Sequence, residues 1–344
     1  MDPDRQPARV AGGEDAAYRL AVSRAAALGI VGVGDMEFGD GFLDWPRRFA
    51  AGVQDLRVRV ATYPTGLDAV LAAGLRAATS LATQAGWCRM GPLKIISDGS
   101  LNTRTAYCHE EYAGGSGLAE PRGRADFSGA DLAELARRAT QAGLRMAVHA
   151  IGDAAITQAL DVFESTGARG TIEHAQLMQP SDVVRMARLG VGPVCSRPIC
   201  WTTATSPRLC WPDRADRCFP LREMVEAGVA LLLGSDAPVS PLDPWLAMAA
   251  AVHRSADERD PWNAGQSLTA AQALAGSTDG CTTVTLGSRA DLVVLEADPL
   301  DGRLATQPRW GSGCGRCRWP PPTSAAGGRS ARVTTTGSAR RSRR

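Results

Sequence analysis

Apolar runs alternate with amphipathic segments along most of the chain, from about residue 15 to residue 300. Seven short runs are largely apolar, which is typical of strands that are buried on both faces of a sheet. The predicted strands are residues 30–36, 56–64, 92–99, 144–150, 170–177, 191–196 and 229–238. Helical patterns separate these strands, as in a parallel sheet that is covered by helices.

The predicted helices have recognisable ends. Residues 128–143 begin with Ser128 as a helix N-cap and end with Gly143. The other predicted helices are residues 14–29, 68–83, 154–166, 180–190, 221–228 and 267–276. This alternation predicts an α/β fold, and the number of strands favours a (β/α)8 TIM-type barrel that lacks its first strand.

Lys94 is the only lysine in a chain that has 38 Lys and Arg residues. Leu93 and Ile95 flank it within a predicted strand, where an ammonium group is costly to remove from water. An amine can lose its proton and form covalent adducts, which a guanidinium group does not do. The sequence therefore indicates a chemical need for an amine at this position. The alternative is that this lysine was retained by chance in a chain that otherwise uses arginine.

Polar residues lie at the ends of four predicted strands, and they are Lys94, His149, His174 and Asp236. In a barrel these ends face one mouth, so we expect the four side chains to converge there. Imidazole and carboxylate groups suit a divalent transition metal that keeps positions open for water. The alternatives are structural roles for the two histidines and an N-cap role for Asp236 in the turn that follows it.

Two chemical roles suit an amine at Lys94. A buried amine has a lowered pKa, and the neutral form can add carbon dioxide to become a carbamate that bridges metal ions. A Schiff base is the rival role at this place in a barrel, but the neighbouring histidines and Asp236 favour the metal site. His109 and His253 fall in a loop and a predicted helix, where surface or supporting roles are expected.

Several stretches resemble the amidohydrolase superfamily, in the amidohydrolase-3 branch that includes N-substituted formamide deformylases. They are "HAIGDAA", "IEHAQLM", "LLLGSDAPVSPLDP" and "GSRADLVVLEADP", and "PLKIISDGSLNTRTAY" resembles the fourth-strand motif of that branch. The resemblance extends from about residue 15 to residue 300. It implies a metal-dependent hydrolase, usually with zinc, that acts on carbon–nitrogen bonds other than peptide bonds.

The resemblance also implies roles for individual residues. Lys94 would be a carbamylated metal ligand, and His149 and His174 would be metal ligands. Asp236 would be both a metal ligand and the general base. Three further residues fall inside the motifs and would support the ligands or contact the substrate; they are Asp98, Arg104 and Asp153.

The chain also departs from the family pattern, because it contains no His-x-His pair of the kind found on the first barrel strand. We expect it to begin just before the second strand, with residues 1–14 disordered and residues 15–275 forming an incomplete barrel. Residues 276–300 would be a remnant of a small β-sandwich, and residues 301–344 a disordered tail. An inactive, truncated or frameshifted relic of the enzyme is therefore the alternative function.

Charge and composition limit the possible partners. The net charge is +2, but residues 301–344 contain ten arginines and one acid, which leaves the remainder at −7. This remainder has no basic patch for nucleic acid, and the chain has no signal-peptide or membrane-spanning pattern, so we expect a cytoplasmic protein. The nine cysteines are scattered, which argues against a disulfide framework, and the Cys314 and Cys317 pair does not favour a zinc knuckle.

The remaining expectation is a small-molecule substrate. Residues 100–127 and 195–213 are predicted to shape its pocket, with Trp201 and Trp211 as apolar walls. The sequence does not indicate the oligomeric state, the number of metal ions or the identity of the substrate.

Overall fold

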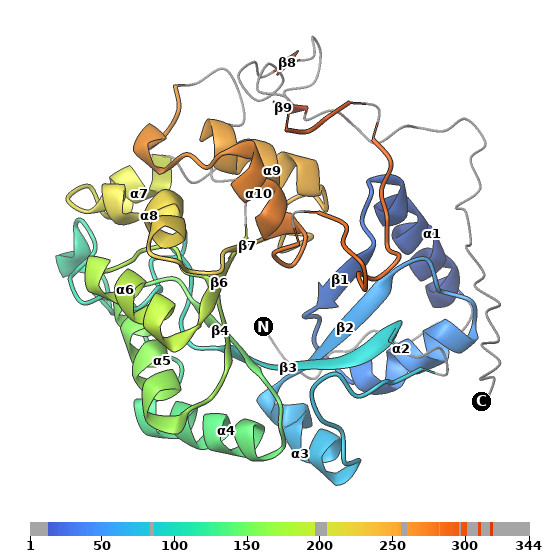
Figure 1. Cartoon of the computed structure of the whole chain (residues 1–344). Helices are drawn as coiled ribbons and strands as arrows, with labels where there is room; N and C mark the ends of the chain where they lie inside the picture. Colours follow the sequence, from blue (N-terminus) through green and yellow to red (C-terminus); the bar gives the residue numbers. More distant parts are fainter. Residues whose placement is uncertain are drawn as a thin grey trace, which may run out of the picture.

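The computed structural model describes residues 13–82, 86–196, 205–255, 260–281, 283–295, 297–300, 309–310 and 317–318. Seven parallel strands form one curled sheet in the order in which they occur in the chain (Figure 1). They are β1 (Gly32–Asp35), β2 (Arg57–Thr62), β3 (Cys88–Ile96), β4 (Met146–Ala150), β5 (Gly170–His174), β6 (Gly192–Ser196) and β7 (Leu232–Gly234). The predicted α/β barrel-like fold is confirmed, and within the described residues β1 and β7 are the two edges of the sheet.

Helices follow the strands and cover the outside of the curled sheet (Figure 1). They are α1 (Gly13–Ala27), α2 (Gly41–Ala50), α3 (Pro64–Ala72), α4 (Gly129–Gln141), α5 (Asp153–Thr166), α6 (Pro180–Leu189), α7 (Thr205–Cys210), α8 (Leu221–Glu226), α9 (Pro244–His253) and α10 (Ala270–Ser277). Short 3₁₀ helices occupy residues 115–117, 215–217 and 264–266. Within the described ranges, no helix combines the length and the apolar content that crossing a membrane requires.

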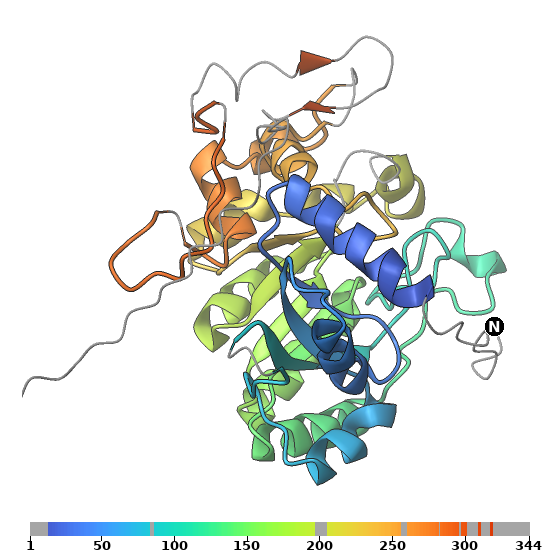
Figure 2. The same cartoon turned by 90° about the vertical axis from the view of Figure 1, so that its right-hand side faces the viewer.

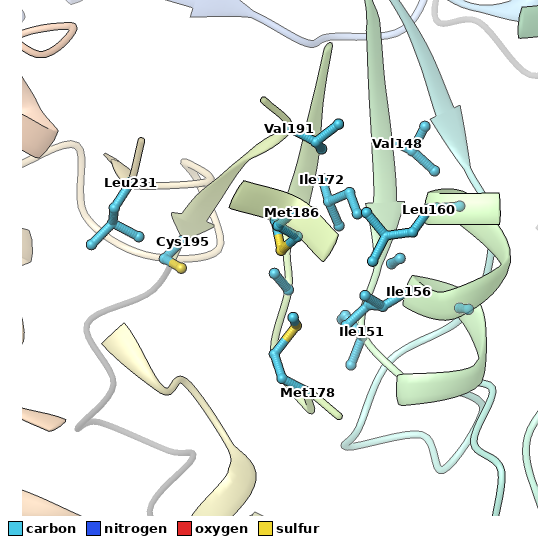
Figure 3. Close-up of a cluster of buried hydrophobic side chains, with 14 of the residues drawn as sticks. Val148, Ile151, Ile156, Leu160, Ile172, Met178, Met186, Val191, Cys195 and Leu231 are labelled. Atoms are coloured by element: carbon cyan, nitrogen blue, oxygen red, sulfur yellow. The ribbon is translucent and has the colours of Figure 1, made fainter. Parts of the chain in front are cut away.

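The main core lies between the sheet and the outer helices (Figure 3). Val148 of β4 and Ile172 of β5 are fully buried there with Leu160 of α5. Each aliphatic side chain of this kind contributes about 1.5–3 kcal/mol when it is fully buried. Successive side chains of a strand point to opposite faces, so His149 and Glu173, which follow Val148 and Ile172, point away from these helices and into the barrel.

Residues of α9 and of the segment after α10 contact the turn after α1 and strand β2. Trp245 of α9 donates from Nε1 to the carbonyl oxygen of Leu28 at 2.8 Å, and Arg57 forms an ion pair with Asp291 at 2.6 Å. The segment around Asp291 runs between β7 and β1 in Figure 1, and Figure 2 shows α1 in front of the sheet on this side. Side-chain contacts therefore connect α9 and the segment after α10 with the turn after α1 and with β2, and no ladder of backbone hydrogen bonds joins β1 and β7 within the described residues.

The structure adds detail to three predicted regions. The helix predicted at residues 68–83 is α3, which begins at Pro64 and ends before Gly74, a residue with φ of +66°. The structure assigns no strand to residues 287–295, where the resemblance predicts part of a β-sandwich remnant, and Leu295 takes part in an isolated β-bridge. Within the predicted disordered tail, β8 (Arg309–Trp310) pairs with β9 (Cys317–Arg318), and the rest of that tail lies outside the described residues.

Candidate functional site

The two predicted histidine ligands meet at the carboxyl ends of neighbouring strands. His149 lies in β4 and His174 ends β5, and Ala150 pairs with His174 in the parallel ladder. Their imidazole rings have centroids 4.5 Å apart, with an angle of 71° between the ring planes. The fold thus brings together two side chains that the sequence placed only at similar positions in separate strands.

The backbone at the end of β5 is unusual for residues that carry a side chain. His174 has φ of +73° and Ala175 has φ of +42°, a region that L-residues adopt at an energetic cost. The Ala175 N–H still donates to the Ala150 carbonyl at 3.1 Å. The chain therefore turns away from the strand direction at His174. Backbone strain of this kind, with φ above zero in residues other than glycine, is concentrated at functional sites.

The end of β3 holds the His149 ring from one side. Nε2 of His149 lies 3.1 Å from the carbonyl oxygen of Gly99, and Ser97 donates from Oγ to the His149 carbonyl at 2.5 Å. Because a carbonyl oxygen can only accept, this contact assigns the ring proton to Nε2. In this tautomer a metal ion would bind His149 through Nδ1.

Asp98 is a fully buried carboxylate that ties the loops after β3 and β4 together. It accepts backbone hydrogen bonds from Tyr107 and Gly152, each at 2.9 Å, and from Ile151 at 3.1 Å. One of its oxygens also lies 3.5 Å from Nε2 of His149. Burial raises the pKa of Asp98 to about 7 even though the backbone donors lower it. Its position supports His149, and full burial removes it from contact with a substrate.

Lys94 is buried in β3, as the sequence predicts, with 7% of its surface exposed. Burial lowers the pKa of its amine, whereas the negative charges of Glu173 and then Asp236 raise it. Alternation along the strand places Lys94 inside the barrel, because its neighbours Leu93 and Ile95 lie in the outer core. The amine is thus desolvated on the side of the sheet that also carries His149.

Glu173 is an interior residue that the sequence analysis did not single out. It pairs with His149 in the β4–β5 ladder, is 6% exposed and accepts a hydrogen bond from Oγ1 of Thr171 at 2.5 Å. Burial raises its pKa, while the charge of Lys94 lowers it. A charged residue inside the apolar stretch "GTIEHA" was the available signal.

Asp236 lies just beyond β7, with φ of +54° and an exposed side chain. It follows the carboxyl end of β7, on the same side of the sheet as the carboxyl ends of β4 and β5, and its charge raises the pKa of both Lys94 and Glu173. Asp243, and not Asp236, is the N-cap of α9, where its side chain accepts from Trp245 and Leu246 backbone N–H groups.

Two of the supporting candidates belong to the scaffold around the mouth. Asp153, at the first turn of α5, accepts from the backbone N–H of His109 at 3.0 Å and from Nε2 of Gln179 at 2.8 Å. Arg104 donates to the carbonyl oxygen of Ala113 within its own loop at 3.4 Å. These contacts order the segments that border the site.

One predicted pocket wall is wrong. Trp211 is fully buried and stacks on Tyr112, with ring centroids 5.5 Å apart, so it belongs to the core and lines no open pocket. Trp201 lies outside the described residues. His109 lies in a loop and His253 ends α9, as expected, and burial lowers the pKa of His253.

Histidine and carboxylate side chains alone do not complete a metal site here. Among the described residues, no group of three or more His, Cys, Asp or Glu side chains is placed to hold a metal ion. Two imidazoles lie in contact, with one buried amine and one exposed carboxylate at the same mouth. A full set of ligands would need a further oxygen donor near the histidine pair.

Comparisons with known proteins show which family the chain resembles. A family model described as "Amidohydrolase family" matches residues 4–305. The putative amidohydrolase YtcJ of Bacillus subtilis is 28% identical over 236 residues, which cover 62% of this chain and 43% of that protein. An N-substituted formamide deformylase of Arthrobacter pascens is 29% identical over 195 residues, which cover 51% of this chain and 36% of that protein. The chain thus spans less than half the length of these relatives.

Two solved structures share the fold. An uncharacterized metal-dependent hydrolase from Pyrococcus horikoshii matches with a TM-score of 0.71 and 26% identity, over 83% of this chain and 61% of that chain. Another, from Pyrococcus furiosus, matches with a TM-score of 0.67 and 27% identity, over 82% of this chain and 60% of that chain. Both proteins are similar to this chain in fold as well as in sequence.

Proposed function

Because the chain belongs to the amidohydrolase family, we propose that it is a metal-dependent hydrolase that cleaves a non-peptide carbon–nitrogen bond in an amide-like substrate. The contact between the His149 and His174 rings carries this proposal, since it joins two nitrogen donors at the mouth of the barrel. The metal-dependent hydrolase fold of the two Pyrococcus proteins supports it. The site would act on a small molecule.

The residues present fit a divalent metal if Lys94 supplies an oxygen donor. A neutral Lys94 amine can attack carbon dioxide, form an N–C bond and release a proton, which yields a carbamate. Burial lowers the pKa of this amine and so favours the neutral form that reacts. His149, His174, Asp236 and the carbamylated Lys94 would then hold the metal, with zinc as the first candidate.

A divalent metal held by these residues would act as a Lewis acid, which lowers the pKa of a bound water molecule and polarises a carbonyl group. Asp236 would accept the proton of the attacking water and deliver it to the leaving nitrogen. Its exposure at the mouth suits a group that must reach both the water and the substrate. Asp98 and Gly99 would keep the His149 ring in one orientation through their contacts with Nε2.

Metal content and amide hydrolysis of the purified full chain test this proposal together. We expect zinc to bind to the wild-type chain and to support hydrolysis of at least one amide in a panel of uncharged and carboxylated compounds. Combined replacement His149→Ala and His174→Ala should remove both properties, while His109→Ala, in an exposed loop position, should keep them. Asp236→Asn should reduce turnover more than metal binding.

The alternative is an inactive member of the family. It predicts no more zinc in the wild-type chain than in the double histidine variant, and no hydrolysis that depends on added metal. A wild-type chain that binds zinc through these histidines, but with full turnover after Asp236→Asn, would instead contradict the assignment of the base.

A further inference from the structure

Two aromatic rings stack on each other near the carboxyl ends of β1 and β2. Tyr63 directly follows β2, and the ladder pairs Thr62 with Leu93, so Tyr63 comes level with Lys94 on the adjacent strand. Phe38, in the loop after β1, stacks on Tyr63 with ring centroids 4.5 Å apart and an angle of 26° between the ring planes. We name Phe38 and Tyr63 together the aromatic ledge.

Hydrogen bonds hold the aromatic ledge in place. Tyr63 donates from Oη to the carbonyl oxygen of Met36 at 2.8 Å. The backbone N–H of Glu37 donates to Asp35 at 3.0 Å, and the Asp35 carboxylate also accepts from Nε1 of Trp45, a buried residue of α2. The loop that carries Phe38 is therefore fixed at its start and against Tyr63, which means that the ring is presented in a defined place.

The Phe38 ring remains largely open to solvent. Its exposed fraction is 67%, although it stacks on a half-buried partner. Exposure of this apolar surface to water is unfavourable. A flat group that covered the ring would be stabilised both by the burial of apolar surface and by ring stacking. The position level with Lys94 would bring such a group next to the proposed reaction centre.

The charges around the aromatic ledge restrict what can bind there. Burial raises the pKa of Tyr63 to about 12, and the negative charges of Glu37, Asp236, Asp35 and Glu173 raise it in the same direction. Asp35 and Glu37 closely precede Phe38 in the chain, and their carboxylates create a negative potential at the ring pair that does not depend on the proposed metal ligand Asp236. An anionic substituent would be repelled, whereas an uncharged aromatic ring would not.

We propose that the aromatic ledge binds the uncharged, flat aromatic substituent of the amide substrate. This inference rests on the proposed hydrolase function and names a substrate class for it. The substrate would be an amide or related compound whose ring stacks on Phe38 while its carbonyl group points to Lys94 and the histidine pair. Amides with a carboxylate on the corresponding side would be poor substrates.

Binding of three model amides to the full chain tests the aromatic ledge without requiring turnover. The probes are N-phenylacetamide, which has a flat ring, N-cyclohexylacetamide, which has a puckered ring, and N-acetylglycine, which has an anionic group. Kd values from ligand-observed NMR titrations, with zinc present, should be lowest for N-phenylacetamide and highest for N-acetylglycine. Phe38→Ala should weaken N-phenylacetamide binding about 3- to 10-fold, as the loss of one aromatic contact implies.

Two further variants separate stacking from general effects on the fold. Phe38→Trp keeps an aromatic face and should retain the preference for N-phenylacetamide over N-cyclohexylacetamide. Val184→Ala removes a side chain of similar exposure, 65%, from the outer helix α6 and should change none of the three Kd values. A Phe38→Ala chain with wild-type Kd values would overturn the inference.

The two proposals fail in different ways. Metal-dependent hydrolysis could be equally fast for the phenyl and cyclohexyl amides, in wild type and in Phe38→Ala. That result would contradict the binding role of the aromatic ledge and support the hydrolase function. Selective binding of N-phenylacetamide that is lost in Phe38→Ala, with no hydrolysis of any amide, would support the aromatic ledge and contradict the hydrolase.

Discussion

The imidazole rings of His149 and His174 lie almost edge to face, with centroids 4.5 Å apart. If both rings bind one zinc ion, His149→Ala and His174→Ala should each weaken zinc affinity at least about 10- to 100-fold, since even residues that only support ligands have effects of that size. Competition titration with a chromophoric chelator measures the change. His109→Ala is the control, and equal affinity in all three variants would show that zinc binds elsewhere.

Lys94 and Glu173 are buried groups inside the barrel that attract each other when both are ionised, and each acts on the pKa of the other in the metal-free, uncarbamylated chain. A double-mutant cycle with Lys94→Met and Glu173→Gln should give a coupling free energy of about 0.5–3 kcal/mol, as found for interacting neighbours. Urea unfolding of the four proteins measures it. The same cycle with Asp236→Asn should give a smaller value, because solvent screens the exposed Asp236. Similar values for both cycles would contradict this picture.

Asp98 accepts backbone hydrogen bonds from three residues, Tyr107, Ile151 and Gly152. Asp98→Ala would leave these buried N–H groups without their acceptor, at about 1–3 kcal/mol for each unsatisfied group. We therefore expect a loss of several kcal/mol in the free energy of unfolding, measured by denaturant titration. Asp68→Ala is the control, because that side chain is 86% exposed in its ion pair and should matter by about 1 kcal/mol or less.

The substitution Gly29→Ala tests whether the segment after α10 packs against the turn that precedes β1. The φ of Gly29 is +82°, and an added Cβ would lie 3.0 Å from Cγ1 of Val293. Gly143 has a similar φ of +70° but nothing within 4 Å of such an atom. Both Ala substitutions should cost about 1 kcal/mol for the backbone, and Gly29→Ala should cost more because of the contact.

The contact part of this prediction has its own check. In a Val293→Ala background, the cost of Gly29→Ala in the free energy of unfolding should fall to that of Gly143→Ala. Thermal or urea unfolding of these variants gives the comparison. Equal costs for the two glycines in the wild-type background would mean that the segment around Val293 does not rest on the turn after α1.

The buried thiols should resist alkylation in the native protein. Burial raises the pKa of Cys88 and of Cys108 to about 12 each, so their reactive thiolate forms stay rare as the pH rises from 7 to 9. Cys281 is exposed. Brief treatment with iodoacetamide at pH 8 followed by peptide mapping should therefore label Cys281 well ahead of Cys88 and Cys108. Equal labelling without denaturant would show that the core opens readily.

The sequence by itself determined the order and type of the main elements. Buried parallel strands require continuous apolar runs, and Gly and Ser at helix ends have local causes, so the seven strands and the cap at Ser128 could be predicted. Local cues were weaker where tertiary contacts decide. The segment around Asp291 has a strand-like composition, but a strand forms only where a partner offers a ladder of hydrogen bonds.

The candidate site shows the same division. The positions of Lys94 within β3, of His149 and His174 at the carboxyl ends of β4 and β5, and of Asp236 just beyond β7 could be predicted from the apolar runs. The sequence could not show that Glu173 would face Lys94 or that Tyr63 would stand level with it, since both depend on the register between strands. Residue types therefore predicted the kind of site, whereas strand register and burial decided which side chains lie together in it.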